Sequence, residues 1–219
     1  MNHLLVATSN KGKLAEILRI FGAEIPQLQL HTLDEFPDAQ DVEENGDSFE
    51  ANALLKARAG FELSGWPTLA DDSGLVIDAL DGRPGIHSAR YSGLGDAGNI
   101  AKVLSELSEI EPDARTARFV TVAAFVDGPG DSKSQVVSGD LITPGEVTTR
   151  GELEGVIAVA PRGEGGFGYD PIFIPEGRDA TLAEFSPAEK DEISHRGRAL
   201  RLIAPLVGLR FAQIQRPVE

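Results

Sequence analysis

The sequence predicts an α/β fold, and three observations support this prediction. Apolar segments typical of strands alternate with amphipathic segments that have the period of a helix. The chain of 219 residues is long enough for one α/β domain with a substantial core. Apolar residues make up 41% and charged residues 25% of the chain, which is ordinary for a globular protein. We therefore expect a single domain over residues 1–219, built as two lobes, with the middle lobe at about 114–160.

The composition argues against several classes of function. The chain has no cysteine, which removes disulfides, thiolate metal sites and cysteine nucleophiles. The net charge of −15 argues against a binder of nucleic-acid polymers, whose affinity comes from a basic face. A small phosphorylated ligand is compatible with this charge, because a local cluster of cations can oppose the overall field. The N-terminus has no signal-peptide pattern, and no apolar run approaches the roughly 20 residues needed to cross a bilayer.

A strand, a polar turn and a helix open the chain. We expect the strand at residues 3–7 and the helix at residues 11–21, capped by Ser9 or Asn10. The turn between them consists of Thr8, Ser9, Asn10, Lys11, Gly12 and Lys13. Free backbone N–H groups at a helix N-terminus, together with two lysines, suit phosphate binding. An ordinary capped turn with surface lysines has the same pattern, and the spacing of a Walker loop is absent.

A second strand, an acidic loop and a second helix follow. We expect this strand at residues 27–33, and the helix from a cap at Asp47 to about residue 63. Asn52 and Lys56 lie four residues apart and therefore share one face of the helix.

The acidic loop ends in Glu43 and Glu44. An isolated acidic pair is usually a solvated loop, and a metal role requires another carboxylate nearby in space. The pair Asp71 and Asp72 is the obvious candidate.

The least ordinary segment of the chain is residues 69–93. Its two adjacent acids, Asp71 and Asp72, stand between apolar runs at residues 68–70 and 75–77, which predicts a strand, a corner and another strand. Buried carboxylates are costly unless a cation or hydrogen bonds compensate them, so we expect a metal and an activated water here. A turn with solvated acids is the alternative, since Asp-Ser-Gly clusters are ordinary turn chemistry.

A helix and several strands are expected in the middle of the chain. The helix covers residues 96–107, with Asp96 as its cap. Strands at residues 114–127 and 134–142 should pair as a hairpin with a long loop, and another short strand is expected at residues 144–150.

Glycines crowd together before the last helices, and they surround Phe167. Because glycine has no side chain, the backbone here can approach a ligand closely. The phenyl ring of Phe167 is suited to stack on a flat base. A glycine-rich turn around a core phenylalanine is the alternative.

Basic residues near the C-terminus complete the candidate site. Lys190 lies in the first turn of a helix that Ser186 should cap, where the helix dipole favours an acid. This unusual position suggests a function, although a tolerated surface lysine is the commoner case. His195 and Arg196 begin a further helix, which Pro205 should kink or break.

Five segments, in this order, carry a resemblance to a known family. They are ATSNKGK (7–13), EENGDSFEANALLKA (43–57), LADDSGL with PGIHSARYSG (69–75 and 84–93), GGFGYDPIF (165–173) and ISHRGRAL (193–200). Each is weak alone, but together they are specific, and the chain resembles the inosine triphosphate pyrophosphatases, also called dITP/XTP pyrophosphatases. Ser9 departs from the glycine that is common at its position, and residues 208–219 lie outside the resemblance.

The resemblance implies an activity and a fold. The family hydrolyses non-standard purine nucleoside triphosphates such as ITP, dITP and XTP to the monophosphate and pyrophosphate, with Mg²⁺ as cofactor. It implies a cytoplasmic homodimer that binds neither a nucleic-acid polymer nor a membrane. The fold should have a mixed, elongated, twisted sheet with flanking helices and two lobes around a central cleft. A nucleotide hydrolase that prefers modified pyrimidines and a nucleotide sensor without turnover are the alternatives.

The resemblance also implies roles for individual residues. The turn from Thr8 to Lys13 would hold the triphosphate, and Glu43 and Asp72 would hold the metal, with Asp72 also the proton acceptor. The remaining substrate-binding residues would be Ser73, Phe167, Gly168, Tyr169, Asp170, Lys190, His195 and Arg196. The last two would read the carbonyl at position six of the purine. The sequence leaves open the roles of Asp71 and Glu44, the rejection of GTP, the number of metal ions, the dimer surface and the strand order.

Overall fold

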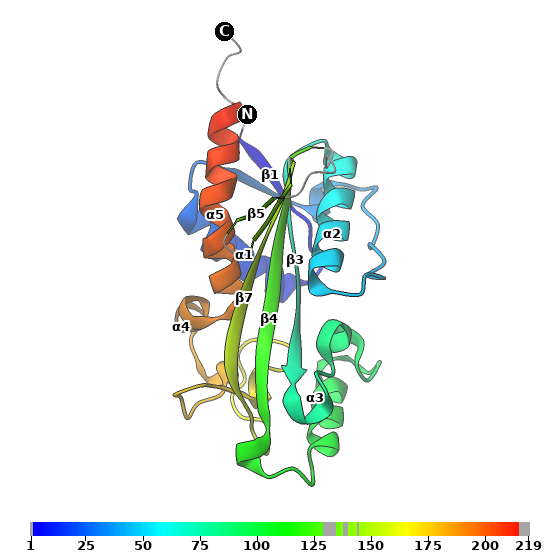
Figure 1. The fold of residues 1–219 in the computed structure, drawn as a ribbon, viewed down its shortest axis with the longest axis vertical. Helices are drawn as coiled ribbons and strands as arrows, with labels where there is room; N and C mark the ends of the chain where they lie inside the picture. Colours follow the sequence, from blue (N-terminus) through cyan, green and yellow to red (C-terminus); the bar gives the residue numbers. More distant parts are fainter. Residues whose placement is uncertain (1, 129–134, 138–139, 144, 215–219) are drawn as a thin grey trace. The chain divides into compact units, whose positions relative to one another are not determined.

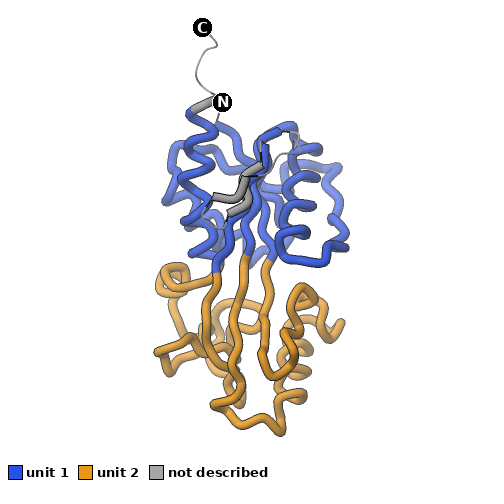
Figure 2. The backbone as a smooth tube through the Cα atoms, viewed as in Figure 1, with its two compact units in different colours: residues 1–72, 122–151, 196–219 blue, residues 73–121, 152–195 orange. Residues whose placement is uncertain are grey.

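The computed structural model describes residues 2–128, 135–137, 140–143 and 145–214. The chain divides into two compact units (Figure 2). Unit 1 comprises residues 1–72, 122–151 and 196–219, and unit 2 comprises residues 73–121 and 152–195. The segment 114–160 therefore contributes to both units, with residues 122–151 in unit 1 and its two ends in unit 2.

The described strands form a mixed sheet in the order β2-β1-β3-β4-β7-β6-β5, and β8 pairs with β7. They are β1 (His3–Val6), β2 (Gln29–Thr32), β3 (Thr68–Ile77), β4 (Thr116–Val126), β5 (Gln135–Val137), β6 (Asp140–Thr143), β7 (Glu146–Ile157) and β8 (Phe173–Pro175). The strand β1 runs parallel to β2 and β3, whereas β5 and β6, β6 and β7, and β7 and β8 pair antiparallel. The predicted α/β class with a mixed sheet is confirmed.

In unit 1, helices cover both faces of the sheet (Figure 1). On one face, α1 (Lys11–Glu24) and α5 (His195–Ile214) pack against Leu4 and Val6 of β1. On the other face lies α2 (Phe49–Ser64), whose Gly60 approaches Leu5 of β1 and Thr68 of β3. Neighbouring residues of a strand point to opposite faces, so the run of Leu4, Leu5 and Val6 contributes apolar side chains to both layers.

In unit 2, a second apolar core forms on the remaining halves of the long strands. It joins Leu75 and Ile77 of β3 with Phe119 of β4 and Leu153 of β7. The helix α3 (Gly95–Glu106) adds Val103, and the following turn adds Leu107. The short helix α4 (Pro187–Ile193) also belongs to this unit. Among the described helices, none combines the length and the apolar character that a membrane span requires.

Four sequence predictions about elements are wrong. The segment 68–77 is one continuous strand, so no corner interrupts it at Asp71 and Asp72. Ser48 rather than Asp47 caps α2, since its hydroxyl accepts a hydrogen bond from the backbone N–H of Ala51. α3 begins at Gly95, and no side chain caps it. The expected hairpin of residues 114–127 and 134–142 is not formed, because β4 lies between β3 and β7 while β5 pairs with β6. Residues 134, 138, 139 and 144 lie outside the described residues.

The last helix also differs from its prediction. The sequence predicts that Pro205 kinks or breaks this helix; α5 extends from His195 to Ile214 with Pro205 inside it, so the helix does not break there. The apolar residues Ala199, Leu200, Ile203, Ala204, Val207 and Phe211 are buried on both sides of the proline in the chain. Their burial against the sheet outweighs the hydrogen bond that proline removes from a helix.

The close approach of α2 to the sheet generates a stability prediction. A Cβ atom at Gly60 would lie 2.6 Å from Thr68 Cγ2 and 3.0 Å from Ala7 Cβ, and both belong to rigid surroundings. We expect Gly60→Ala to lower the free energy of unfolding by about 1–2 kcal/mol, because overpacking exceeds the gain in helix propensity. Gly22→Ala in α1 is the matched control, since its new Cβ would meet only Leu30 at 4.0 Å. It should raise the free energy of unfolding by up to about 1 kcal/mol. Urea denaturation of both variants measures the two changes, and a stabilised Gly60→Ala variant would contradict the packing argument.

Candidate functional site

The N-terminus of α1 forms the first part of the candidate site. Asn10 caps the helix, because its side-chain oxygen accepts a hydrogen bond from the backbone N–H of Lys13 at 3.0 Å. The hydroxyl of Thr8 in turn accepts a hydrogen bond from the backbone N–H of Asn10 at 3.3 Å. The first turn of α1 contains no acidic residue, so its positive dipole end is not neutralised from within the helix. This arrangement fits the phosphate-binding turn that the sequence suggested.

Asp71 and Asp72 point to opposite faces of β3. Both carboxylates are buried, with Asp71 1% and Asp72 4% exposed, so the alternative of a solvated turn is wrong. Because side chains alternate along a strand, Asp71 faces α1 and α5 while Asp72 faces α2. Two adjacent residues of one type therefore lie in two different environments.

On the α2 face, Asp72 is held by two side chains. Lys56 Nζ lies 3.1 Å from Asp72 Oδ1, and the amide of Asn52 donates to Asp72 Oδ2 at 3.3 Å. Lys56 also contacts Glu44 Oε1 at 2.8 Å, while Asn52 accepts the backbone N–H of Gly46 at 2.9 Å. The acidic loop is thus tied to Asp72 by both residues that share this face of α2.

On the other face, Asp71 joins a buried network of charges. Its Oδ2 atom lies 3.3 Å from Lys13 Nζ and 3.2 Å from Arg196 Nε. Arg196 is 1% exposed and also forms an ion pair with Glu16 of α1, which is buried too. Two carboxylates and two cations balance each other here, and burial of charges requires such pairing.

Sequence reasoning missed Glu16. A signal was present, since Glu16 follows Lys13 by three residues and therefore shares its face of α1. Ile20 follows Glu16 by four residues, so this acid also shares a face with a buried apolar residue of the helix. Asn52 was recognised only as a neighbour of Lys56, and its bond to Asp72 could not be read from the sequence.

The two aspartates differ in their pKa values. Burial alone would raise the pKa of Asp71, but Lys13, Arg196 and Lys56 outweigh burial and hold its pKa well below the usual range. Burial raises the pKa of Asp72, and Lys56 and Lys13 offset this only in part. Asp72 is therefore the better proton acceptor of the two.

The pKa values of the neighbouring lysines also differ. Burial lowers the pKa of Lys13, and Asp71 opposes this without cancelling it. Burial would lower the pKa of Lys56 as well, but Asp72, Asp71 and Glu44 hold it above its usual value. The two lysines differ because the cations Lys56 and Arg196 also lower the pKa of Lys13, whereas three carboxylates raise that of Lys56.

A divalent cation fits the carboxylates on the α2 face. Asp72 and Glu44 carry two negative charges and Lys56 one positive charge, which leaves these three groups one negative charge in excess. Glu43, next in sequence to Glu44, is exposed and adds a further carboxylate. No group of three or more potential ligands is found within the described residues. Mg²⁺ does not require one, because it commonly binds one or two carboxylates together with phosphate oxygens and waters.

Unit 2 contains the remaining residues implied by the resemblance, apart from Arg196. Lys190 of α4 is 5% exposed, and its ammonium forms an ion pair with Asp170, so it is not a surface lysine. The same ammonium lies 4.7 Å from the centre of the Phe167 ring, a cation–π contact. Phe167 is half-buried and does not belong to the apolar core of its unit, which favours the ligand-binding interpretation over a core phenylalanine.

The other predicted residues of unit 2 belong to the loop that carries Phe167, to the start of α5 or to the sheet. The hydroxyl of Tyr169 donates to the carbonyl of Ser88 at 2.8 Å. His195 stacks on Phe119 of β4, with ring centres 4.6 Å apart and ring planes 7° apart. Ser73 belongs to β3 and is half-buried, two residues after Asp71 on the same face. The predicted residues thus form two groups, one within each unit.

The chain is similar to several known proteins over almost its whole length. A profile of the Ham1 family matches residues 4–206. The dITP/XTP pyrophosphatase of Geobacter sulfurreducens is 48% identical over 210 residues, which covers 95% of this chain and 98% of that protein. The dITP/XTP pyrophosphatase of Geobacillus kaustophilus is 46% identical over 204 residues, which covers 91% of each chain.

Solved structures agree with these sequence matches. A HAM1 protein from Coxiella burnetii has a TM-score of 0.80 and 38% identity, and the match covers 95% of this chain and 99% of that one. The nucleoside-triphosphatase, or dITP/XTP pyrophosphatase, of Mycobacterium abscessus has a TM-score of 0.68 and 44% identity over 93% of this chain and 99% of that one. The expected family and the enzyme class, a nucleoside triphosphate pyrophosphatase, are confirmed. Because the match extends through nearly all of both units, the chain belongs to the Ham1 family.

Proposed function

We propose that the chain hydrolyses non-standard purine nucleoside triphosphates, such as ITP, dITP and XTP, to the nucleoside monophosphate and pyrophosphate. The observation that carries the proposal is the division of Asp71 and Asp72 between two faces of β3. One aspartate is held ionised among cations, while the other is a buried carboxylate with a raised pKa beside an acidic loop. The relatives' shared name supports the same reaction.

The proposal assigns the triphosphate to the N-terminus of α1. Backbone N–H groups of Lys11 and Gly12 point out of the first helical turn, where no helical carbonyl can accept them. The ammonium of Lys13 adds charge, and Asp71 fixes its position through their 3.3 Å contact. These donors stabilise the negative charge that develops on the departing pyrophosphate.

The proposal assigns the proton transfer to Asp72. Asn52 and Lys56 hold its two carboxylate oxygens, so its orientation is fixed before substrate binds. A raised pKa makes a carboxylate a stronger base, which suits it to accept the proton of the attacking water. When bound by Glu43 and Asp72, Mg²⁺ would neutralise phosphate charge and lower the pKa of that water.

The proposal assigns the purine to Phe167 and the pair His195 and Arg196. The Phe167 ring offers a flat surface for stacking. Arg196 is held in place by Asp71 and Glu16, to which its guanidinium donates hydrogen bonds. The resemblance assigns to His195 and Arg196 the carbonyl at position six of the purine, an acceptor that matches the N–H groups of an imidazole and a guanidinium. Adenine presents an amino group there, which would leave buried donors unpaired and so disfavour ATP.

A panel of triphosphates tests the proposed specificity. With Mg²⁺ present, we expect pyrophosphate release from ITP, dITP and XTP to exceed that from ATP by about 100-fold or more in kcat/KM, because unpaired buried donors are costly. Equal rates on ATP and ITP would contradict the selectivity. A preference for modified pyrimidines would identify a different hydrolase, and binding without turnover of any substrate would identify a sensor. The homodimer that the resemblance implies is also proposed, together with a cytoplasmic location; light scattering of the purified protein tests the dimer.

The variant Asp72→Asn tests the proton acceptor. An amide is nearly the same shape and can still accept the Asn52 hydrogen bond, but it cannot take a proton from water. We expect kcat on ITP to fall by at least about 100-fold, the scale of general-base catalysis. Circular dichroism and binding of a non-hydrolysable ITP analogue should remain near normal. Turnover close to that of the unmodified protein would place the proton acceptor elsewhere.

The variant Lys13→Ala tests the triphosphate site. Loss of one charged contact should weaken binding of the non-hydrolysable ITP analogue by roughly 10-fold or more, and inosine monophosphate much less. Arg118→Ala is the control, because it also removes one positive charge and Arg118 pairs with Asp78 outside the candidate site. Competition assays measure the affinities for the ITP analogue and for inosine monophosphate in each variant. An equal loss for triphosphate and monophosphate would remove Lys13 from the phosphate site.

A further inference from the structure

The segment 84–93 and the helix α3 have no role in the proposed function, yet both contact the loop that carries Phe167. The carbonyl of Ser88 accepts hydrogen bonds from the Tyr169 hydroxyl at 2.8 Å and from the Asn99 amide at 3.3 Å. The hydroxyl of Ser88 accepts the backbone N–H of Leu75, at 2.8 Å, which ties the segment to β3. The segment and α3 therefore form a frame to which the loop is attached.

The loop that carries Phe167 is rich in glycine, so its own residues do not restrict the backbone to one conformation. Gly163, Gly166 and Gly168 have φ values of +79°, +73° and +60°, a region that favours glycine. A Cβ atom at Gly166 would collide with the carboxylate of Asp170, so this glycine also permits a close approach. Since glycine leaves many backbone conformations accessible, hydrogen bonds to neighbouring elements have to select the one in which Phe167 is held.

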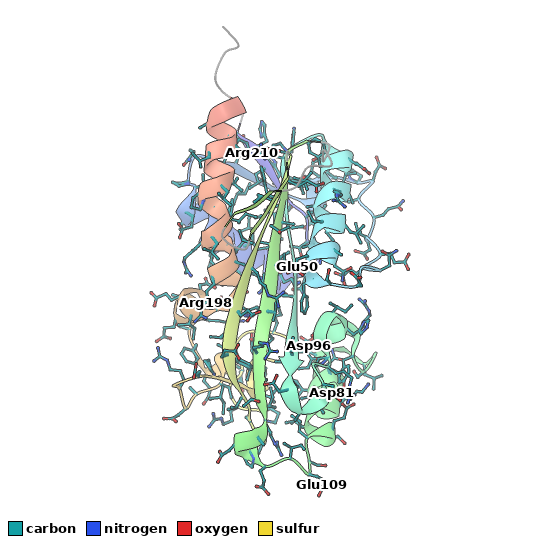
Figure 3. The ribbon with its side chains drawn as sticks, in the orientation of Figure 1. Glu50, Asp81, Asp96, Glu109, Arg198 and Arg210 are labelled. Atoms are coloured by element: carbon teal, nitrogen blue, oxygen red, sulfur yellow. The ribbon has the colours of Figure 1, made fainter. Side chains whose placement is uncertain are left out.

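Two carboxylates select this conformation by binding consecutive backbone N–H groups. The N–H of Phe167 donates to Asp170 Oδ2 at 2.8 Å, within the loop itself. The N–H of Gly168 donates to Asp96 Oδ2, also at 2.8 Å, and Asp96 belongs to the first turn of α3 (Figure 3). Asp170 is 2% exposed and paired with Lys190, whereas Asp96 is exposed. Asp96 is thus the solvent-accessible one of the two carboxylates that bind these consecutive N–H groups.

The position of Asp96 in its own helix supports a tertiary role. The sequence suggested Asp96 as the cap of α3, but the structure gives that helix no side-chain cap. Its carboxylate is directed to the loop instead, across 72 positions of sequence. An acid in the first turn is favoured by the helix dipole, so this role imposes no penalty on α3.

We propose that Asp96 is a positioning residue for the purine base of the substrate. Through the N–H of Gly168, Asp96 holds the Phe167 ring in the position where it stacks on the purine. This inference rests on the proposed function and extends it to a residue outside the segments that bind substrate. Without Asp96, the loop retains the bond of the Phe167 N–H to Asp170 but loses that of the Gly168 N–H, so one carboxylate instead of two holds the backbone that carries the ring. Affinity for the purine falls, while the groups that act on the triphosphate are unaffected.

The variants Asp96→Ala and Asp96→Asn test this role, with Glu109→Ala as a matched control. Glu109 is another exposed acid of unit 2, so its loss changes the charge in the same way (Figure 3). We expect Asp96→Ala to raise KM for ITP by about 5-fold, the scale of one hydrogen bond, with kcat changed by less than about 2-fold. Asp96→Asn should restore KM, because its amide oxygen still accepts from Gly168. Inhibition by inorganic tripolyphosphate, which has no base, should be unchanged in all three variants.

Hydrogen exchange of the Gly168 amide gives a second readout that needs no substrate. Exchange measured by NMR should be faster in Asp96→Ala and near normal in Asp96→Asn and Glu109→Ala, because only the first variant removes the acceptor. Unchanged Gly168 exchange in Asp96→Ala would overturn the inference on its own. An unchanged KM, or an equal loss of tripolyphosphate inhibition, would overturn it as well. Failure of the unmodified protein to hydrolyse ITP would instead overturn the proposed function, and the exchange measurement would still decide whether Asp96 holds the loop.

Discussion

The alternation of side chains along β3 is the constraint on which the candidate site of unit 1 depends. It directs Asp71 and Asp72 to opposite faces, so that the two carboxylates have different contact partners. Cations from α1 and α5 meet Asp71, and a lysine from α2 meets Asp72. Because each face supplies its own compensation, two adjacent acids can be buried in a continuous strand without a turn.

Three of the six lysines in the chain are each held by a buried carboxylate. Lys13 is paired with Asp71, Lys56 with Asp72 and Lys190 with Asp170. A lysine restrained in this way loses its rotamer freedom during folding, so under the proposed function less remains to be lost when a phosphate binds. For Lys13 and Lys56, the nearby carboxylates also oppose the lowering of the lysine pKa by burial.

Local features of the candidate site were predictable from the sequence, while its tertiary partners were not. The helix of α1 and its cap depend on residues within one turn; the sequence predicts the helix and narrows the cap to Ser9 or Asn10, of which Asn10 caps it. The continuity of β3 was not, because Asp-Ser-Gly is typical of turns and the sequence does not show which cations lie on either face. Arg196 lies 125 positions from Asp71, and no local pattern links them. The pairing of β4 with β7 rather than with the next strand is equally non-local.

The presence of buried charges in unit 1 is better explained by the positions they give to side chains of the candidate site than by a contribution to the stability of the fold. Replacing a buried group of ion pairs by apolar residues of similar volume is often neutral or stabilising, so Asp71, Glu16 and Arg196 are not required merely to fill the core. What apolar residues could not do is fix the ammonium of Lys13 beside the open N-terminus of α1. Nor could they lower the pKa of Asp71 while the pKa of Asp72 is raised. The network therefore separates two adjacent carboxylates into a permanent anion that positions a lysine and a base that can accept a proton.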